Sequence, residues 1–372
     1  FPSLQERWKF IEQTHKKAYF LKFVPMMGSV GCPYTCSFCI DAAIPYQQIS
    51  FDVMKEDLSF LLTKYKHPMV AWQDPNFGVR FGENMDAIAS VAPPDRFRFL
   101  AESSLSILSE DHLKIMQQHN FIALLPGIES WYDMGNKSMA AHMGATQKLN
   151  KVSDQVNMIL QYVPYIQTNF VLGLDCDSGE EPFELTKQFV DKSPGAFPGY
   201  SLLTSFGEAA PLNLEYQREG RVLPFPFHFL NNHLAMNLKP KNYEWIDFYD
   251  KVIDLTEYTF SKKAIYNRLM ASSHFTTRIM NVMRAISSEG YGRIRFYKKV
   301  KEHLTNDSAF RKYFEGETKQ LPTFYKKIIE KDLGVWMQWL PQGALDHDPN
   351  AYLNKTKNEI YAKPKAGKLS YS

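Results

Sequence analysis

Three cysteines close together are the residues of this chain best suited to chemistry. Cys32, Cys36 and Cys39 stand in a CxxxCxxC spacing after a run typical of a strand, so one loop offers three thiolates to one metal centre. A structural zinc ion would require a fourth ligand, such as a distant histidine or Cys176. An iron–sulfur cube held by three thiolates instead leaves one iron open for a substrate or cofactor. The spacing favours the iron–sulfur centre, with a zinc knuckle as the alternative.

The cysteine loop needs a frame of strands and helices to position it. Short apolar runs alternate with segments of helical period up to about residue 205, which predicts parallel strands joined by crossover helices. The runs with strand character are 19–27, 68–74, 97–103, 121–130, 166–174 and 200–206. The segments with helical character are 51–65, 110–119, 150–162 and 181–192. The sequence therefore predicts an α/β fold, a partial (β/α)6 TIM-type barrel, in which Asp52 caps the first of these helices.

The composition changes after the barrel. Pro211, Pro224 and Pro226 interrupt an aromatic stretch, and a helical pattern rich in Tyr, Phe and Lys begins near residue 242. The predicted units are a lead-in helix over 1–18, a core barrel over 19–207, a connecting segment over 208–241, a C-terminal helical region over 242–345 and a polar tail over 346–372. The aromatic residues of 223–229 predict either a lid over a hydrophobic substrate or packing between the barrel and the helices.

Composition and charge limit the class of protein. With 372 residues, 44% of them hydrophobic, the chain can bury one large core or two ordinary ones. The formal net charge of +3 is too small to indicate a nucleic-acid partner. Four cysteines, three of them in one loop, do not make a disulfide framework, so we expect a cytoplasmic protein. No apolar run in the sequence reaches the length of a membrane span, and the start at Phe1 rather than Met is what a piece of a longer protein would show.

Carboxylates follow four of the predicted strands. These strand ends carry Asp74, Glu102, Glu129 and the pair Asp175 and Asp177. In parallel β/α folds the carboxyl ends of the strands meet at one edge, where ligands bind, so we expect these side chains around the cysteine loop. Any one of them is explained equally well as a cap, a turn residue or half of a salt bridge.

Two polar side chains alternate with apolar ones on the fifth predicted strand. Gln167 and Asn169 occupy the face opposite Ile166 and Phe170. Polar groups inside a barrel need hydrogen-bond partners. We therefore expect Gln167 and Asn169 to contact a cofactor or the substrate.

The cysteine spacing, with the aromatic Phe38 before the last cysteine, resembles the signature of the radical S-adenosylmethionine (SAM) superfamily. Further runs resemble one branch of it, namely Asp74-x-Asn76-Phe77, Gly127-Ile128-Glu129-Ser130, Gly173-x-Asp175-x-Asp177 and Glu219-Gly220-Arg221. Members of this branch usually carry an N-terminal cobalamin-binding domain, and many transfer methyl groups. There is no room for that domain before residue 20, so either this chain is a fragment that lacks it or the protein works without cobalamin.

The resemblance implies a cofactor set and a reaction. Cys32, Cys36 and Cys39 would ligate a [4Fe–4S] cluster, whose open iron would bind SAM for reductive cleavage to a deoxyadenosyl radical. The radical would modify a small-molecule or lipid substrate, and cobalamin-dependent methyl transfer is one form of this reaction. The electron would come from a donor such as flavodoxin or ferredoxin.

The resemblance also implies places for the cofactor-binding side chains. Phe38 would lie by the adenine of SAM. Asp74 and Asn76 would lie near its methionine end, and Glu102 and Glu129 near its ribose.

Two residues after the fifth predicted strand complete the expected site. Gly173 would let the backbone approach the adenosyl group. Cys176 would be either a buried structural thiol or a pocket residue that acts on a substrate radical, and it is the candidate catalytic residue.

A non-catalytic protein is the alternative to the radical SAM enzyme. In that case an iron–sulfur cluster or a zinc ion in the same loop would stabilise the barrel or dock a partner. A tRNA-modifying relative is a weaker option, because neither a strongly basic stripe nor an added RNA-binding module is present in the sequence.

Overall fold

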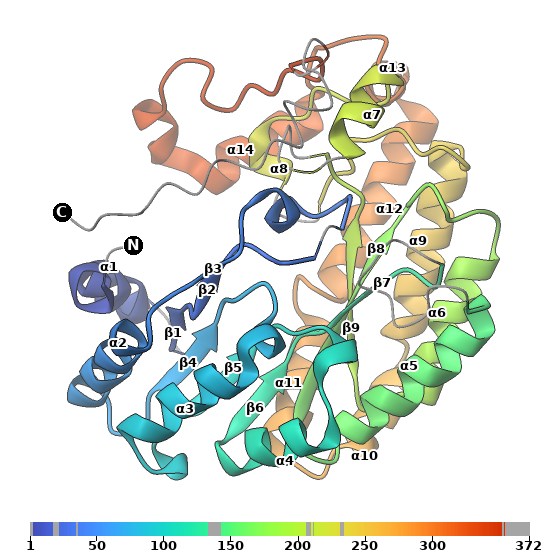
Figure 1. Cartoon of the computed structure of the whole chain (residues 1–372). Coiled ribbons are helices and arrows are strands. Elements are labelled where there is room, and N and C mark those ends of the chain that lie inside the picture. The colour runs from blue at the N-terminus through green and yellow to red at the C-terminus, as the bar shows by residue number, and fades with distance from the viewer. Residues whose placement is uncertain are drawn as a thin grey trace.

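The computed structural model describes residues 3–17, 22–34, 36–132, 143–205, 210, 212–230, 234–351 and 353. Its central parallel sheet contains, in spatial order, β1 (Phe23–Met26), β4 (Met69–Trp72), β5 (Arg98–Ala101), β6 (Phe121–Leu124), β8 (Tyr165–Leu172) and β9 (Phe197–Leu202). The short strand β7 (Gly127–Glu129) also runs along β8. Among the described residues β1 and β9 do not pair with each other, so the barrel is open on one side (Figure 1). The predicted α/β fold with a partial (β/α)6 barrel is confirmed.

One predicted strand is two strands in the structure. The run 121–130 is divided into β6 and β7 at Pro126. Proline has no N–H to donate, and the carbonyl oxygen of Pro126 instead accepts a hydrogen bond from the backbone N–H of Asn169 at 3.0 Å. The break turns the chain at the carboxyl end of the sheet, where the functional site lies.

The prediction for the last strand is wrong at both ends. The sequence predicts 200–206, whereas β9 begins at Phe197 and ends at Leu202, and residue 206 lies outside the described ranges, as do residues 19–21 of the first predicted strand. Pro198 and Gly199 look like strand breakers in the sequence. They are tolerated because β9 is an edge strand that pairs with β8 alone among the described strands.

Helices on the outside connect the strands. They are α2 (Phe51–Lys64), α3 (Phe81–Val91), α4 (Glu110–Gln118), α5 (Ala145–Ile159) and α6 (Glu181–Lys192), with short 3-10 turns η2 (Phe77–Arg80), η3 (Pro94–Arg96) and η4 (Leu105–Ile107). The sequence analysis missed α3, and α5 begins five residues before the predicted 150–162 segment. Asp52 does not cap α2. Ser50 does, because its hydroxyl accepts a hydrogen bond from the backbone N–H of Val53 at 3.4 Å and Phe51 is already helical.

A small hairpin brackets the cysteine loop. Strands β2 (Ser29–Val30) and β3 (Gln47–Gln48) pair antiparallel, and the loop between them contains the three cysteines and the 3-10 turn η1 (Ile40–Ala43). The cysteine loop is therefore tied at both ends to paired backbone.

Helix α1 (Leu4–Lys17) packs on α2, and the backbone N–H of Leu4 donates to the Asp57 carboxylate at 2.8 Å.

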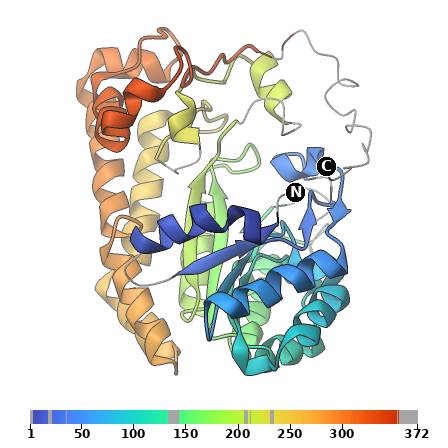
Figure 2. The same ribbon diagram turned by 90° about the vertical axis from the view of Figure 1, so that its left-hand side faces the viewer.

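The C-terminal part is helical and stands along one side of the barrel (Figure 2). It consists of α7 (Leu212–Arg218), α8 (Phe227–Leu230), α9 (Trp245–Thr259), α10 (Lys262–Ala271), α11 (Phe275–Ile286), α12 (Tyr291–Asn306), α13 (Ser308–Phe314), α14 (Thr323–Leu333) and the 3-10 helix η6 (Gly334–Trp339). Helix α9 packs on both α6 and α12, which joins this part to the barrel. Most of the predicted polar tail, residues 352 and 354–372, lies outside the described residues.

The aromatic stretch 223–229 is partly in the core. Phe225 and Phe229 are fully buried, and the Phe225 ring makes edge-to-face contacts with Tyr313 and Tyr325 at centroid distances of 5.0 Å. Phe227 is 47% exposed. The contacts of Phe225 and Phe229 favour packing against the C-terminal helices over a lid.

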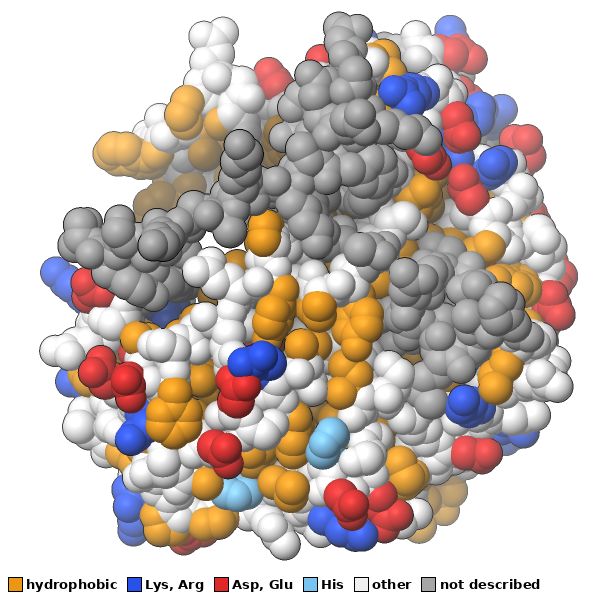
Figure 3. All heavy atoms as spheres, in the orientation of Figure 1, with side chains coloured by type: hydrophobic (Ala, Val, Ile, Leu, Met, Phe, Trp, Pro, Cys, Tyr) orange, Lys and Arg blue, Asp and Glu red, His pale blue; other side chains and the backbone are white. Residues whose placement is uncertain are grey.

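Two surface properties bear on partners. No helix within the described ranges is both long and apolar enough to cross a membrane. On the face drawn in Figure 3, acidic and basic side chains are interspersed around the edge, and hydrophobic side chains lie toward the middle. The mixture of signs on this face agrees with the small net charge of +3.

Candidate functional site

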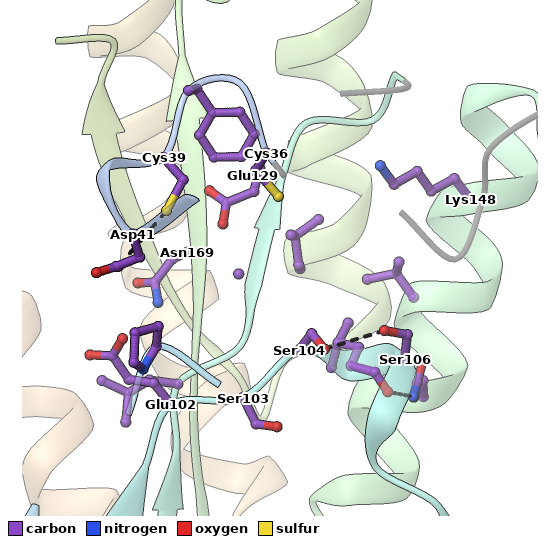
Figure 4. A pocket seen from close by; sticks show the side chains of 18 of the residues that line it. Cys36, Cys39, Asp41, Glu102, Ser103, Ser104, Ser106, Glu129, Lys148 and Asn169 are labelled. Atoms are coloured by element: carbon purple, nitrogen blue, oxygen red, sulfur yellow. Dashed lines mark hydrogen bonds between the residues drawn. The ribbon is translucent and has the colours of Figure 1, made fainter. Parts of the chain in front are cut away.

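A cavity of about 220 Å³ lies at the carboxyl edge of the sheet, beside the cysteine loop (Figure 4). We call it the cysteine cavity. Its lining comes from the cysteine loop, from the ends of the parallel strands and from one face of α5. The lining residues are Cys36, Phe38, Cys39, Asp41, Pro75, Glu102, Ser103, Ser104, Leu105, Ser106, Leu125, Gly127, Ile128, Glu129, Lys148, Lys151, Val152, Gln155 and Asn169.

The backbone conformation of Gly31 sets the entry to the cysteine loop. Gly31 has a φ of 72°, in the left-handed region that favours glycine. A Cβ atom at this position would lie 2.5 Å from the carbonyl oxygen of Ile44 and 2.6 Å from that of Pro45. The start and the end of the loop therefore touch through backbone, and a side chain at position 31 would separate them.

The structure brings two of the three cysteines into the cavity. Cys36 is buried, Cys39 is half-buried, and the backbone N–H of Cys39 donates to the carbonyl of Cys36 at 3.1 Å. Figure 4 shows both side chains pointing into the cavity. Cys32 is buried and does not line it. Within the described ranges no three His, Cys, Asp or Glu side chains are grouped closely enough to hold a metal ion.

The donor chemistry of the loop nevertheless fits an iron–sulfur cluster. All four cysteines lie in the described part of the chain and none of them is in a disulfide, so three thiols within eight residues remain as soft ligands. Metal binding is coupled to folding, because the ligands of such a site are rarely assembled in the unfolded chain. Cys32, Cys36 and Cys39 are the residues that would hold the cluster.

Four of the expected cofactor-binding residues line the cavity. These residues are Phe38, Glu102, Glu129 and Asn169. Glu129 has a φ of 64°, and its carboxylate folds back so closely over Gly127 that a Cβ atom there would collide with it. A side chain at position 127 would therefore have to displace the end of the Glu129 side chain.

Gln167 does not line the cysteine cavity. Its side-chain amide donates to the amide oxygen of Asn169 at 2.7 Å, so it orients a residue that does line it. On β8, Gln167 and Asn169 are half-buried while Ile166 and Phe170 are fully buried, which agrees with the predicted alternation of faces.

Asp74 lies behind the cysteine loop and not in the cavity. It is 1% exposed, and its carboxylate accepts hydrogen bonds from the backbone N–H groups of Gly28 and Ser29 at 2.6 and 3.0 Å and from the Ser29 hydroxyl at 2.9 Å. Burial raises the pKa of Asp74, and these hydrogen bonds oppose the shift. The structure therefore makes Asp74 a positioning residue for the hairpin that holds the cysteines.

Asn76, which also follows β4, has a similar positioning role toward the segment after β5. Its side-chain amide donates to the Ser104 hydroxyl at 3.0 Å, and its oxygen accepts from the Ser103 hydroxyl and the Ser104 backbone N–H at 3.1 Å each. Asn76 does not line the cavity, whereas both serines do. Asp74 and Asn76, which we expect near the methionine end of SAM, both lie behind residues that line the cavity.

Gly173, which we expect to let the backbone approach the adenosyl group, lies against other parts of the protein in the structure. Gly173 has a φ of 87°, and a Cβ atom there would lie 2.9 Å from the Met236 side chain and 3.1 Å from the Phe248 ring. The close approach that requires glycine is thus to α9 and the connecting segment. Gly173 does not line the cysteine cavity.

Cys176, the candidate catalytic residue, does not line the cavity either. Its sulfur lies 3.6 Å from the Ser130 hydroxyl and 3.9 Å from the Asp177 carboxylate. Burial raises the pKa of the Cys176 thiol to about 11. A half-buried thiol with a raised pKa fits the structural interpretation of this residue better than the catalytic one.

We expect Cys176 to be alkylated slowly. With the pKa raised to about 11 from an ordinary value of 9.0, the thiolate fraction at pH 8 falls by about 100-fold, and the rate with iodoacetamide should fall accordingly. Peptide-resolved mass spectrometry of a time course measures this rate against a free cysteine peptide. Equal rates for Cys176 and the free peptide would contradict the assignment.

Asp177 should make stability depend on pH. Burial raises the pKa of its carboxyl group from 3.8 to about 6. The folded protein then holds this proton more tightly than the unfolded chain, so the free energy of unfolding is highest below pH 3.8 and falls by up to about 3 kcal/mol as the pH rises toward 6. Urea unfolding of the parent and of Asp177→Asn across pH 4 to 7 measures the difference between them. If the parent and Asp177→Asn lose the same free energy of unfolding over this pH window, the Asp177 carboxyl group does not cause the pH dependence.

An ion pair joins two of the motifs that the sequence analysis singled out. The Arg221 guanidinium donates to both oxygens of the Asp175 carboxylate, at 2.7 and 2.8 Å, and to Glu219 at 2.8 Å. Asn242 adds a hydrogen bond to the Asp175 carbonyl oxygen at 2.9 Å. The Gly-x-Asp-x-Asp run after β8 and the Glu-Gly-Arg run after α7 are thus held against each other.

The sequence did not predict the contribution of α5 to the lining of the cysteine cavity. Lys148, Lys151, Val152 and Gln155 line the cavity from this helix, and Lys148 is buried with its ammonium donating to the carbonyl of Tyr132 at 3.3 Å. A helix beginning at residue 150 would not include Lys148. The signal available in the sequence was the three-to-four-residue spacing of these side chains.

Comparison with known proteins gives distant similarity. No family model matches the chain. A curated relative, bacteriochlorophyllide d C-12(1)-methyltransferase of Chlorobaculum tepidum, is 25% identical over 205 residues. The match covers 53% of this chain and 43% of the relative, so this chain spans less than half of the relative's length.

Solved structures with a distant likeness to the chain include two SAM radical enzymes and a synthase. The radical SAM methyltransferase TsrM of Kitasatospora setae, with tryptophan and a SAM analogue bound, has a TM-score of 0.48 and 12% identity, with 75% of this chain and 62% of that chain covered. The cobalamin-dependent SAM radical enzyme OxsB has a TM-score of 0.42 and 11% identity, covering 91% and 58%. Methylornithine synthase has a TM-score of 0.38 and 15% identity, covering 73% and 77%.

Proposed function

We propose that this chain is a radical SAM enzyme. Cys32, Cys36 and Cys39 would hold a [4Fe–4S] cluster, and the protein would cleave SAM reductively to modify a small-molecule or lipid substrate. The observation that carries the proposal is the placement of the CxxxCxxC loop at the carboxyl edge of an open parallel barrel, with Cys36 and Cys39 lining a cavity there.

The charges around the cavity suit a ligand of mixed charge. Asp41, Glu102 and Glu129 line it together with the lysines Lys148 and Lys151. SAM carries a sulfonium and an ammonium group that carboxylates can bind, and a carboxylate that a lysine ammonium can bind. The arrangement therefore supports a zwitterionic cofactor better than a purely anionic or apolar ligand.

Phe38 and the carboxylates have separate tasks in this proposal. The Phe38 ring offers an apolar surface for the adenine, and Glu102 and Glu129 offer acceptors for ribose hydroxyl groups. The cluster, when bound, supplies one open iron and the electron that breaks a carbon–sulfur bond of SAM. Apolar side chains such as Leu105, Leu125 and Ile128 line the same cavity and would exclude water from the reacting groups.

Methyl transfer is the reaction we favour within this class. Its support is the name of the curated relative, which is a methyltransferase at 25% identity over half of this chain. Cobalamin, which members of the branch that the motifs resemble usually bind, would be the methyl carrier. Retention of added cobalamin by the protein through gel filtration, with a stoichiometry near one, would support this form of the reaction, and no retention would favour a reaction without cobalamin.

Anaerobic reconstitution with iron and sulfide tests the proposed class. The reconstituted protein is reduced with dithionite in the presence of SAM, and deoxyadenosine is measured by liquid chromatography. Bound iron and sulfide near four of each, together with deoxyadenosine formation, would support the radical SAM enzyme. A protein that binds only zinc, or that binds a cluster and leaves SAM intact, would favour the non-catalytic alternative.

A further inference from the structure

A second cavity of about 100 Å³ lies along β8 and β9, where the turn between α11 and α12 covers the open edge of the barrel. We call it the arginine cavity. Its lining residues are Gln167, Asn169, Phe197, Pro198, Gly199, Tyr200, Ser201, Phe260, Arg284, Glu289 and Arg293. Asn169 also lines the cysteine cavity, so the two cavities meet at this side chain.

Positive charge is in excess around the arginine cavity. Arg284 is paired with Glu289 and donates to the Tyr165 hydroxyl, and its guanidinium lies 4.0 Å from the centre of the Phe197 ring. Glu289 is the one carboxylate in the lining. Arg293 also lines the cavity, so its lining contains two guanidinium groups and one carboxylate.

Arg293 is the cation without a compensating charge. One of its terminal nitrogens donates to the backbone carbonyl oxygen of Tyr200 at 2.7 Å, within the edge strand β9. Its Nε atom is buried and has no hydrogen-bond partner, and within the described ranges Arg293 makes no ion pair. The hydrogen bond to Tyr200 therefore uses only part of the donor capacity of this guanidinium.

The Arg293 side chain is half-buried, and burial of its Nε atom without a hydrogen-bond partner is costly, while the planar donors of a guanidinium match the two oxygens of a carboxylate or phosphate group. The cavity has room for about three water molecules, which is the size of such a group and too small for SAM. Gln167, Asn169 and Ser201 add neutral polar side chains around it. These features agree on a small anion as the occupant.

We propose that the arginine cavity binds an anionic group of the substrate, a carboxylate or a phosphate, while the reacting part of the substrate lies beyond Asn169 in the cysteine cavity. The assignment of the anion to the substrate rests on the proposed radical SAM function. Binding of the anion itself does not require the cluster. Arg293 would be the main anchor and Arg284 would contribute after partial release from Glu289.

Equilibrium dialysis tests this site directly. The whole chain is dialysed against ³²P-labelled inorganic phosphate and, separately, against ¹⁴C-labelled acetate, at constant ionic strength set with chloride. We expect saturable binding of one of the two anions at a stoichiometry of one, and the stronger one identifies the group as phosphate or carboxylate. Arg293→Gln should weaken this binding by about tenfold or more.

Two further variants make the result specific. Arg295→Gln removes an exposed arginine two residues along the same helix and should leave binding unchanged. Glu289→Gln removes the competing carboxylate and should strengthen anion binding several-fold. This variant tests the site even if Arg293→Gln does not fold. Absence of saturable binding to the parent, equal effects of Arg293→Gln and Arg295→Gln, or unchanged binding by Glu289→Gln would each overturn the proposal.

The same measurement separates the site from the proposed function. A variant with Cys32, Cys36 and Cys39 all changed to alanine should bind the anion as the parent does. Anion binding without SAM cleavage would retain the site and reject the enzyme, whereas SAM cleavage without anion binding would retain the enzyme and reject the site.

Discussion

Replacing Cys36 with alanine is expected to abolish cluster assembly and SAM cleavage. Cys36 is a buried thiol that lines the cavity at the carboxyl edge of the sheet, so its loss leaves two ligands for a cluster that needs three. Changes to outer-shell residues of metal sites typically cost 10–100-fold, and loss of a ligand should reduce deoxyadenosine formation by about 100-fold or more. Iron and sulfide analysis, the visible spectrum and the deoxyadenosine assay measure the effect.

Cys176→Ala is the matched control for this prediction. It removes a cysteine of the same fold that does not line the cysteine cavity. The control should keep the cluster and cleave SAM at close to the parental rate. Cluster assembly by Cys36→Ala, or equal loss of activity in both variants, would contradict the assignment of Cys36 as a ligand.

Asp74→Ala is expected to destabilise the fold strongly and to disturb the cysteine loop. The substitution leaves the backbone N–H groups of Gly28 and Ser29 and the Ser29 hydroxyl without their acceptor in a buried place. Buried donors that lose a partner cost about 1 to 3 kcal/mol each, and partial relaxation should leave a net loss of about 3 kcal/mol in the free energy of unfolding. Urea denaturation followed by circular dichroism measures this loss.

Asp74→Asn separates hydrogen bonding from charge. Its amide oxygen can keep the two backbone donors, and its NH₂ group can donate to the Ser29 hydroxyl, so the loss should stay below about 1 kcal/mol. Cluster assembly should then survive in Asp74→Asn and fail or weaken in Asp74→Ala. Similar stability of the two variants would show that the carboxylate does not position the hairpin in the way proposed.

The parallel barrel could be predicted from the sequence because its signals are local. Apolar runs of strand length alternate with segments of helical period, and residues such as Ile166 and Phe170 alternate with polar neighbours on β8. The start of β9 could not be predicted in the same way. Pro198 and Gly199 fit a strand only at the edge of a sheet, and edge position is a property of the whole fold.

The site could be predicted in part. The family resemblance indicated Phe38, the strand ends indicated Glu102 and Glu129, and the alternation on the fifth strand indicated Asn169. The structure places these four side chains in the lining of the cysteine cavity. Spacing could not tell which strand-end residues turn away from it. Asp74, for example, bonds to the neighbouring hairpin because Gly28 and Ser29 present unpaired donors there, and this follows from tertiary contacts 45 residues apart in the chain.

The lining from α5 was missed for a related reason. Helix boundaries are the least certain part of a pattern-based prediction, and moving the start of α5 to Ala145 brings Lys148 onto the helix. The arginine cavity depends on contacts between β8, β9 and the turn after α11, which lie far apart in the sequence. Such a site has no short motif.

The left-handed turn at Gly31 changes what counts as the motif in this protein. Backbone atoms of Ile44 and Pro45 fill the space where any side chain at position 31 would go, while Pro33 is exposed and can vary more freely. A pattern made of cysteine spacing alone would accept sequences that cannot form this loop. For searches or grafts based on this protein, the minimal unit is therefore Gly-Cys-x-x-x-Cys-x-x-Cys, because a side chain at position 31 would collide with the backbone of the same loop.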